Sequence, residues 1–166
     1  MLKKTYYISC ILIVVSLIAG CSTYSNKLSI SGEINELEWD ASIYHTLNSF
    51  DSVKMTVIND SISNTGLTLY FENSSNYNCI FGEHYWLEKK INGNWYRVPV
   101  MIEGNYGFND IGYNLSSGSD ANWTVDWKWL YGSLDSGEYR IIKDILNFRS
   151  AGDFDTYYLA AEFLIK

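Results

Sequence analysis

The stretch that decides the fold is Tyr85-Trp86-Leu87-Glu88-Lys89-Lys90-Ile91-Asn92-Gly93-Asn94-Trp95-Tyr96-Arg97-Val98. Its centre, Asn92-Gly93, is a favoured pair for a two-residue type I′ turn, because both central positions of that turn need a positive φ. Runs that alternate between apolar and polar side chains flank the pair on both sides. The sequence therefore predicts an antiparallel β-hairpin with the turn at Asn92-Gly93.

A two-residue turn also fixes which side chains share a face of the hairpin. Leu87 faces Val98 on an aliphatic face, which we expect to point into the core. Glu88 faces Arg97 on the opposite face, as a cross-strand pair of opposite charge. The side chains on this second face are Trp86, Glu88, Lys90, Trp95 and Arg97.

Alternating apolar and polar residues predict further strands outside the hairpin. The apolar members of these runs are Val53, Met55 and Val57; Leu67, Leu69 and Phe71; Trp123, Val125, Trp127 and Trp129; Tyr139 and Ile141; and a final run over 157–165. Aromatic residues make up 16% of the chain and there is one Pro, a composition that favours strands. Residues 103–120 are predicted to be a long, loosely structured connection. The sequence thus predicts an all-β fold, an antiparallel β-sandwich of about seven strands.

The N-terminus has the parts of a bacterial export signal. Lys3 and Lys4 give it a positive start, and the apolar stretch 8–20 is too short to cross a bilayer as a helix. The segment Leu17-Ile18-Ala19-Gly20-Cys21 resembles the lipobox of bacterial lipoproteins, in which the Cys thiol receives diacylglycerol. We therefore expect residues 1–20 to be a lipoprotein signal peptide and Cys21 to carry the lipid. The alternative is an ordinary signal cleaved near Ala19, with Cys21 unmodified.

The mature chain predicted in this way is acidic. The twelve Lys and Arg become ten once Lys3 and Lys4 are removed, against nineteen Asp and Glu. Nucleic acids and anionic lipid surfaces repel such a chain, so we expect no nucleic-acid partner. We therefore expect palmitate-type acyl chains on Cys21 to anchor it to the extracytoplasmic face of the cell membrane. Residues 21–50 are predicted to be a tether and a lead-in element, followed by one domain over 51–166.

The cysteines predict a domain without a disulfide. Cys10 leaves with the signal peptide and Cys21 is acylated, so Cys79 is the one thiol left in the mature chain. The apolar run Cys79-Ile80-Phe81 favours a buried, unreactive thiol over an exposed, reactive one.

The segment Asp135-Ser136-Gly137-Glu138-Tyr139-Arg140-Ile141 resembles the tyrosine corner of immunoglobulin folds, in which the Tyr hydroxyl bonds to the chain upstream. Ile141 stands where such folds place their second disulfide Cys. Over about 52–166 the chain resembles the bacterial Ig-like domains of exported lipoproteins, mostly Gram-positive. The motifs that carry this resemblance are Gly82-Glu83, 87–90, Asn92-Gly93 with Trp95-Tyr96, 123–127, 129–132, 137–141 and 157–163. The resemblance implies an Ig-like sandwich outside the cytoplasm and supplies no catalytic residue. In such a sandwich we expect Leu69 and Ile141 on the facing inner surfaces.

Motifs that carry catalysis or bind metals are missing from the sequence. The two histidines, His45 and His84, lie outside any nucleophile or zinc motif. Asp110, Asp144, Asp153 and Asp155 offer carboxylates for Ca²⁺, but without the spacing of a calcium loop. We therefore predict no catalytic residue, no metal site and no cofactor.

These observations predict a membrane-anchored, non-enzymatic Ig-like module that serves as a binding domain or spacer, with an envelope protein or glycan as partner. Trp86, Trp95 and Arg97 are the predicted ligand-binding residues, because exposed aromatic and Arg side chains concentrate binding energy. Packing of the indoles under the N-terminal segment, or Trp95 stacking on Lys90, is the alternative. Two other functions stay open: a purely structural stalk, and a small envelope enzyme built from Glu83, His84, Asp110 and Asp155.

Overall fold

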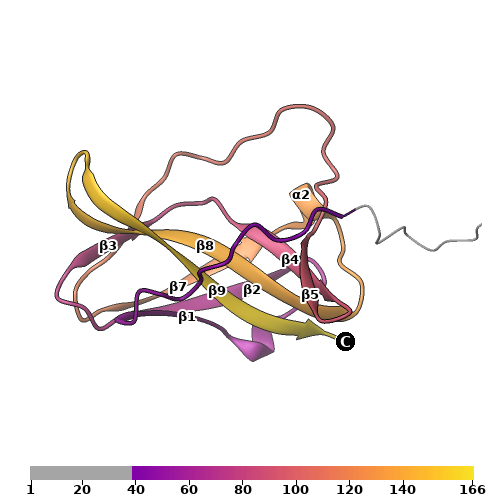
Figure 1. The fold of residues 1–166 in the computed structure, drawn as a ribbon, viewed down its shortest axis with the longest axis horizontal. Coiled ribbons are helices and arrows are strands. Elements are labelled where there is room, and N and C mark those ends of the chain that lie inside the picture. Colours follow the sequence, from indigo (N-terminus) through magenta and orange to yellow (C-terminus); the bar gives the residue numbers. More distant parts are fainter. Residues whose placement is uncertain (1–38) are drawn as a thin grey trace, which may run out of the picture. The chain divides into compact units, whose positions relative to one another are not determined.

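The computed structural model describes residues 39–166, which form a β-sandwich of two antiparallel sheets (Figure 1). The predicted signal peptide, the predicted lipid-attachment residue Cys21 and most of the predicted tether lie outside the described residues. In the part of the chain that the structure describes, none of the helices is long and apolar enough to span a bilayer.

The first sheet has the strand order β1-β2-β7 and consists of β1 (Val53–Val57), β2 (Gly66–Asn73) and β7 (Asp120–Asp126). The short 3-10 helix η3 (Asn59–Ser61) lies in the connection between β1 and β2. Leu69 on β2 pairs with Trp123 on β7, and both side chains are buried. The alternating apolar residues predicted from the sequence thus form the inner face of this sheet.

The second sheet is built on the long strand β8 (Gly137–Ser150). On one edge β8 pairs along its length with β9 (Asp153–Ile165). On the other edge it pairs with β4 (Trp86–Ile91) and then with β3 (Asn78–Phe81), so β3 and β4 act as one strand interrupted at 82–85. The outer partners are β5 (Asn94–Arg97) on β4 and β6 (Tyr113–Leu115) on β3.

The predicted hairpin is confirmed in its register. Glu88 pairs with Arg97 across β4 and β5, and Asn92 and Gly93 form the turn with φ of 51° and 85°. Leu87 and Val98 are buried, as the aliphatic face predicts.

Two sequence predictions about local structure are wrong. Trp129 does not continue the β7 strand: it lies in the short helix α2 (Lys128–Tyr131) and is 46% exposed. The chain turns there because an Asp126 carboxylate oxygen accepts the Lys128 N–H, at 2.8 Å. Residues 103–120 are not wholly loose, because they contain β6.

The core has the features that the Ig-like resemblance implies. Leu69 and Ile141 come from opposite sheets and are both fully buried in one apolar cluster. The Tyr139 hydroxyl donates to the Asp135 carbonyl oxygen at 3.0 Å, which is the upstream bond of a tyrosine corner. Cys79 is a free, fully buried thiol, and burial raises its pKa.

One charged side chain, Lys143, lies fully inside this core. It sits on β8 opposite the interruption between β3 and β4, where the strand ladder leaves carbonyl groups unpaired. Its Nζ donates to the carbonyl oxygens of Gly82 and His84, at 2.6 and 2.8 Å, and lies 3.8 Å from the centre of the Trp123 ring. Burial lowers the pKa of Lys143 to about 8, with Asp144 and Glu83 acting in the opposite direction.

The segment 39–50, which we call the N-terminal strap, crosses the outer face of the second sheet and is drawn in indigo (Figure 1). At the β5 edge the Arg97 N–H donates to the Asp40 carbonyl, at 2.8 Å, and the Ser42 N–H donates to the Trp95 carbonyl, at 2.9 Å. At the β9 edge Asn48 makes three hydrogen bonds, one to Tyr158 and two to Ala160. The strap is therefore hydrogen-bonded to both edges of the second sheet.

Candidate ligand-binding groove

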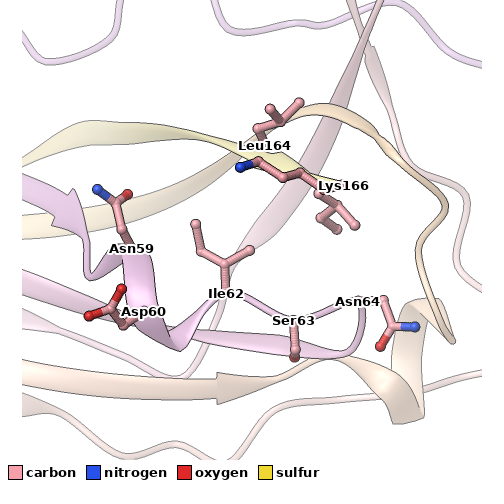
Figure 2. Close-up of a pocket in the computed structure, with 8 residues that line it drawn as sticks. Asn59, Asp60, Ile62, Ser63, Asn64, Leu164 and Lys166 are labelled. Carbon is pink, nitrogen blue, oxygen red and sulfur yellow. The ribbon is translucent and has the colours of Figure 1, made fainter.

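A hollow of about 780 Å³ lies between η3 and the end of β9 (Figure 2). It is lined by Asn59, Asp60, Ile62, Ser63, Asn64, Leu164, Ile165 and Lys166. Asp60 and Lys166 are its ionisable side chains, and no aromatic ring lines it. Five of its eight lining residues are polar or charged, whereas small-ligand sites are lined predominantly by apolar and aromatic side chains.

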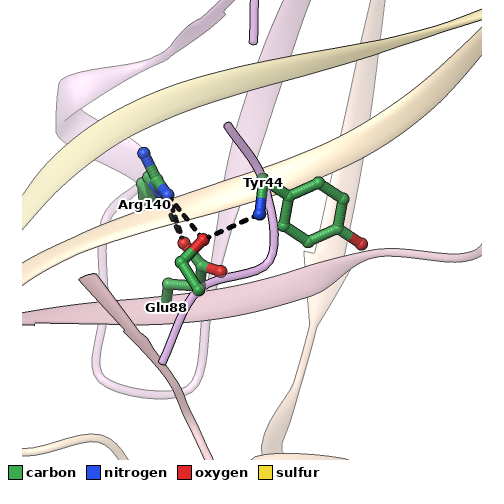
Figure 3. Close-up of polar contacts among 4 residues, drawn as sticks. Tyr44, Glu88 and Arg140 are labelled. Atoms are coloured by element: carbon green, nitrogen blue, oxygen red, sulfur yellow. Dashed lines mark hydrogen bonds and ion pairs between the residues drawn. The ribbon is translucent and has the colours of Figure 1, made fainter. Parts of the chain in front are cut away.

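The strap covers a buried ion pair on the outer face of the second sheet (Figure 3). Glu88 is fully buried, and its Oε2 lies 2.7 Å from Nε and 2.5 Å from Nη2 of Arg140. The same guanidinium donates to Ser42 Oγ at 3.1 Å, and that oxygen accepts the Tyr44 N–H, also at 3.1 Å. The ion pair therefore helps to hold the strap on the sheet.

This arrangement changes the expected role of Arg97. Arg97 faces Glu88 in the hairpin as predicted, but the expected ion pair between them is not formed. Arg140 faces Glu88 from β8, and its guanidinium forms the ion pair with the Glu88 carboxylate instead. The Arg97 guanidinium makes no hydrogen bond or ion pair with residues 39–166, whereas Arg140 and Arg149 are both paired. Its donors are thus available to a ligand.

Arg97 opens into a groove of about 250 Å³. The walls come from the strap, from β4 and β5, and from the connection that follows β5. The groove is lined by Trp39, Asp40, His84, Tyr85, Trp86, Leu87, Arg97, Val98, Pro99, Val100, Tyr106 and Tyr131. It therefore combines three accessible aromatic rings, those of Trp39, Trp86 and Tyr106, with one guanidinium and one carboxylate.

The rings of the groove belong to a longer aromatic band. Trp86 lies 4.0 Å from the His84 ring and 5.4 Å from the Tyr44 ring, measured between centroids. The band continues through Phe108 to Trp129, which is half exposed. Partial burial lowers the pKa of His84, with Asp144 acting in the opposite direction.

Trp95 lies apart from this groove, although the sequence grouped it with Trp86 and Arg97. It lines a third hollow, of about 450 Å³, with Tyr44, His45 and Arg140. The guanidinium carbon of Arg140 is 4.4 Å from the ring centre, and Lys90 Nζ is 5.6 Å away. Both structural alternatives from the sequence are therefore realised: Trp86 packs against Tyr44 of the strap, and Trp95 stacks on Lys90. The structure brings Trp86 and Arg97 together and leaves Trp95 outside.

Several lining residues were not predicted. Trp39 and Asp40 belong to the predicted lead-in element, and Tyr106 belongs to the predicted loose connection, and no site was expected in either segment. They reach the groove through tertiary contacts that leave no local pattern in the sequence, although the aromatic character of Trp39 and Tyr106 was visible.

The structure does not assemble the carboxylate-based enzyme site. The Tyr113 hydroxyl donates to Glu83, while Asp155, like Asp153, is held by Arg149. Within residues 39–166 no three His, Cys, Asp or Glu side chains are grouped so that they could hold a metal ion. The four residues Glu83, His84, Asp110 and Asp155 are thus not brought to one place.

The arrangement of strands and the tyrosine corner define an immunoglobulin-like β-sandwich without a disulfide. The chain belongs to the bacterial Ig-like domain family, whose sequence profile matches residues 49–164. A fold of this kind supports a non-enzymatic binding or structural module.

Comparison with solved structures finds a similarity to the ASH/PapD-like domain of human CEP192, PapD-like domain 7. The TM-score is 0.32 and the sequence identity 12%, over 73% of this chain and 93% of that one. Comparison with curated proteins gives no match.

Proposed function

We propose that the protein is a lipid-anchored extracytoplasmic module that binds a saccharide unit of the cell envelope in the groove around Arg97. The observation that carries the proposal is the guanidinium of Arg97, which lies among aromatic rings and makes no hydrogen bond or ion pair within residues 39–166. A partly buried guanidinium without a partner is costly, and a ligand that accepts its hydrogen bonds removes that cost.

The chemistry of the groove favours a sugar ring. A pyranose presents C–H groups on its faces and hydroxyl groups around its rim. Trp39, Trp86 and Tyr106 offer aromatic surface to the faces, while Arg97 donates hydrogen bonds and Asp40 accepts them. The volume of about 250 Å³ suits one or two rings better than a folded protein.

The groove also favours binding over catalysis. His84 is its imidazole, and its side chain has no hydrogen bond to a hydroxyl or thiol nucleophile within residues 39–166. A hydrolase acting through a nucleophile needs such a pair, and one acting through carboxylates needs two of them across the bond. Asp40 is the single carboxylate among the lining residues.

The lipobox-like segment 17–21 supports the lipid anchor. Because the mature chain is acidic, its charge would not hold it on anionic lipids, so a membrane location needs such an anchor. We expect Cys21→Ala to lose acyl-chain labelling and to leave the membrane fraction or accumulate as precursor. A Cys21→Ala protein that is still processed and acylated would contradict the anchor.

The groove is tested with soluble peptidoglycan fragments as the probe, titrated against the mature chain and followed by Trp fluorescence. We expect saturable binding by the wild type and at least a tenfold loss with Arg97→Ala. Arg149→Ala is the matched control, because Arg149 is an exposed arginine outside the groove. Wild-type protein that binds no fragment would contradict the proposed ligand.

A further inference from the structure

We infer that the free edge of β7 binds an extended peptide by strand addition, and that the peptide carries a basic side chain at each end of the paired stretch. This surface lies on the first sheet, whereas the saccharide groove lies on the second. The inference is therefore independent of the proposed function.

The hydrogen bonds at the two ends of β7 show which of its backbone groups point outward. The Asn73 N–H donates to the Ser119 carbonyl, and the Trp127 N–H donates to the Thr65 carbonyl, both at 2.9 Å. Odd-numbered residues of this stretch therefore bond to β2, because the direction alternates along an antiparallel ladder. The N–H and C=O groups of Asn122 and Thr124 point away from β2.

No residue of 39–166 forms a backbone hydrogen bond with these outward groups. The other long edges of the sandwich are at least partly covered within the described range: strap residues 40–42 lie on β5, Asn48 is bonded to Tyr158 and Ala160 of β9, and β1 lies beside β9. β6 is an edge strand of three residues. β7 thus presents seven residues of strand with an uncovered edge.

The edge lacks most of the usual protection against pairing. Natural edge strands are guarded by Pro, by charged side chains, by a bulge or by shortness. β7 has the sequence DANWTVD and pairs regularly with β2, and its charged residues, Asp120 and Asp126, stand only at its two ends. An edge of this kind supplies a row of hydrogen bonds to a partner strand.

The charges at the edge identify the partner. Asp120 and Asp126 are exposed at the two ends of β7, and Glu72 lies directly opposite Asp120 on β2. A second copy of β7 in the fully overlapping antiparallel register would place Asp120 against Asp126 at both ends, and like charges that face each other are destabilising. A segment with Lys or Arg opposite both aspartates meets complementary charge instead.

The geometry of paired strands fixes the spacing between the two basic residues of the peptide. Residues opposite Asp120 and Asp126 are six positions apart, and their side chains share one face with the residues opposite Asn122 and Thr124. The probe is therefore the labelled peptide Lys-Val-Thr-Val-Thr-Val-Lys. Its controls are the same peptide with Glu at both ends and the same peptide methylated on the amides that would face β7.

Fluorescence anisotropy with the full mature chain tests the inference. We expect the Lys peptide to bind about tenfold more tightly than the Glu peptide at low salt, with a smaller difference at high salt. The methylated Lys peptide should lose binding, because it keeps the charge and lacks the donors. Equal binding of the methylated and unmethylated peptides, or no binding at all, would overturn the inference.

Two protein variants complete the test. Thr124→Pro removes an outward N–H and the side-chain hydrogen bond to Thr68, but it leaves the backbone hydrogen bonds to β2 in place. It should weaken binding of the Lys peptide at least tenfold. Asp120→Lys should reduce the preference for the Lys peptide and raise binding of the Glu peptide. The urea-unfolding curve of each variant, compared with the wild type, reports whether it is folded. A folded Thr124→Pro protein with wild-type peptide affinity would refute strand addition. If that variant does not fold, the comparison of methylated and unmethylated Lys peptides on the wild-type protein is the test.

Discussion

The buried ammonium of Lys143 predicts how the stability of the domain depends on pH. Burial lowers its pKa to about 8, from an ordinary value of 10.5. Between about pH 8 and pH 10.5 the unfolded chain therefore binds more protons than the folded chain, so the free energy of unfolding rises with pH in this window. For these two pKa values, the Lys143 contribution rises by about 2 kcal/mol between about pH 7 and pH 9.5.

Lys143→Met isolates this contribution, because it keeps an unbranched side chain of similar length and removes the titrating group. Burial raises the pKa of Tyr44, Tyr85 and Tyr131, so these groups lower stability once the unfolded tyrosines ionise above about pH 10. They are present in both proteins and cancel in the difference. The wild type should therefore gain about 2 kcal/mol relative to Lys143→Met between about pH 7 and pH 9.5.

The assay is urea unfolding followed by Trp fluorescence at several pH values across this range. Lys54→Met is the control, because Lys54 is exposed on β1 and its loss should leave the pH profile parallel to the wild type. A difference between wild type and Lys143→Met that stays constant over the range would refute the reasoning, since it would mean that Lys143 keeps its unfolded-state pKa in the fold.

Three further predictions concern the packing of the domain. Ile141→Ala should lower the free energy of unfolding by about 2–5 kcal/mol, because Ile141 is fully buried between the sheets, and a loss below 1 kcal/mol in urea unfolding would argue against that position. Glu88→Gln should cost about 3–5 kcal/mol, because it leaves the Arg140 charge buried without its counter-ion, and protease cleavage within the strap should become faster; unchanged stability and cleavage would show that the ion pair does not hold the strap. Cys79 should react with a thiol reagent only after unfolding, because it is fully buried and burial raises its pKa, and fast labelling of the native protein would contradict its place in the core.

The hairpin and the core strands could be predicted from the sequence because their signals are local. Asn92-Gly93 fixes the register by its own conformational preference, and the alternation around Leu69 and Ile141 is a property of each strand alone. Trp129 was misplaced because the alternation runs on past Asp126, while the turn depends on a hydrogen bond that alternation does not report.

The site was less predictable because its decisive contacts join distant segments. Arg97 and Arg140 both face Glu88 from neighbouring strands. Because the position of β8 beside β4 is not visible in the sequence, the sequence does not show that Arg140 forms the ion pair and that Arg97 lines the groove. The strap likewise has no repeating pattern, since it is held by scattered hydrogen bonds. The burial of Lys143 does have a signal in the sequence. Lys143 alternates with Ile141 and Ile145 on the inward face of the strand, where a charged residue needs a partner.

The central claim is that Arg97 and the surrounding rings form a saccharide-binding groove. The most direct measurement is the affinity of the mature chain for soluble peptidoglycan fragments, compared among wild type, Arg97→Ala and Arg149→Ala by Trp fluorescence. The account predicts equal saturable binding by wild type and Arg149→Ala, and binding at least tenfold weaker for a folded Arg97→Ala. Equal affinity of all three proteins would contradict it.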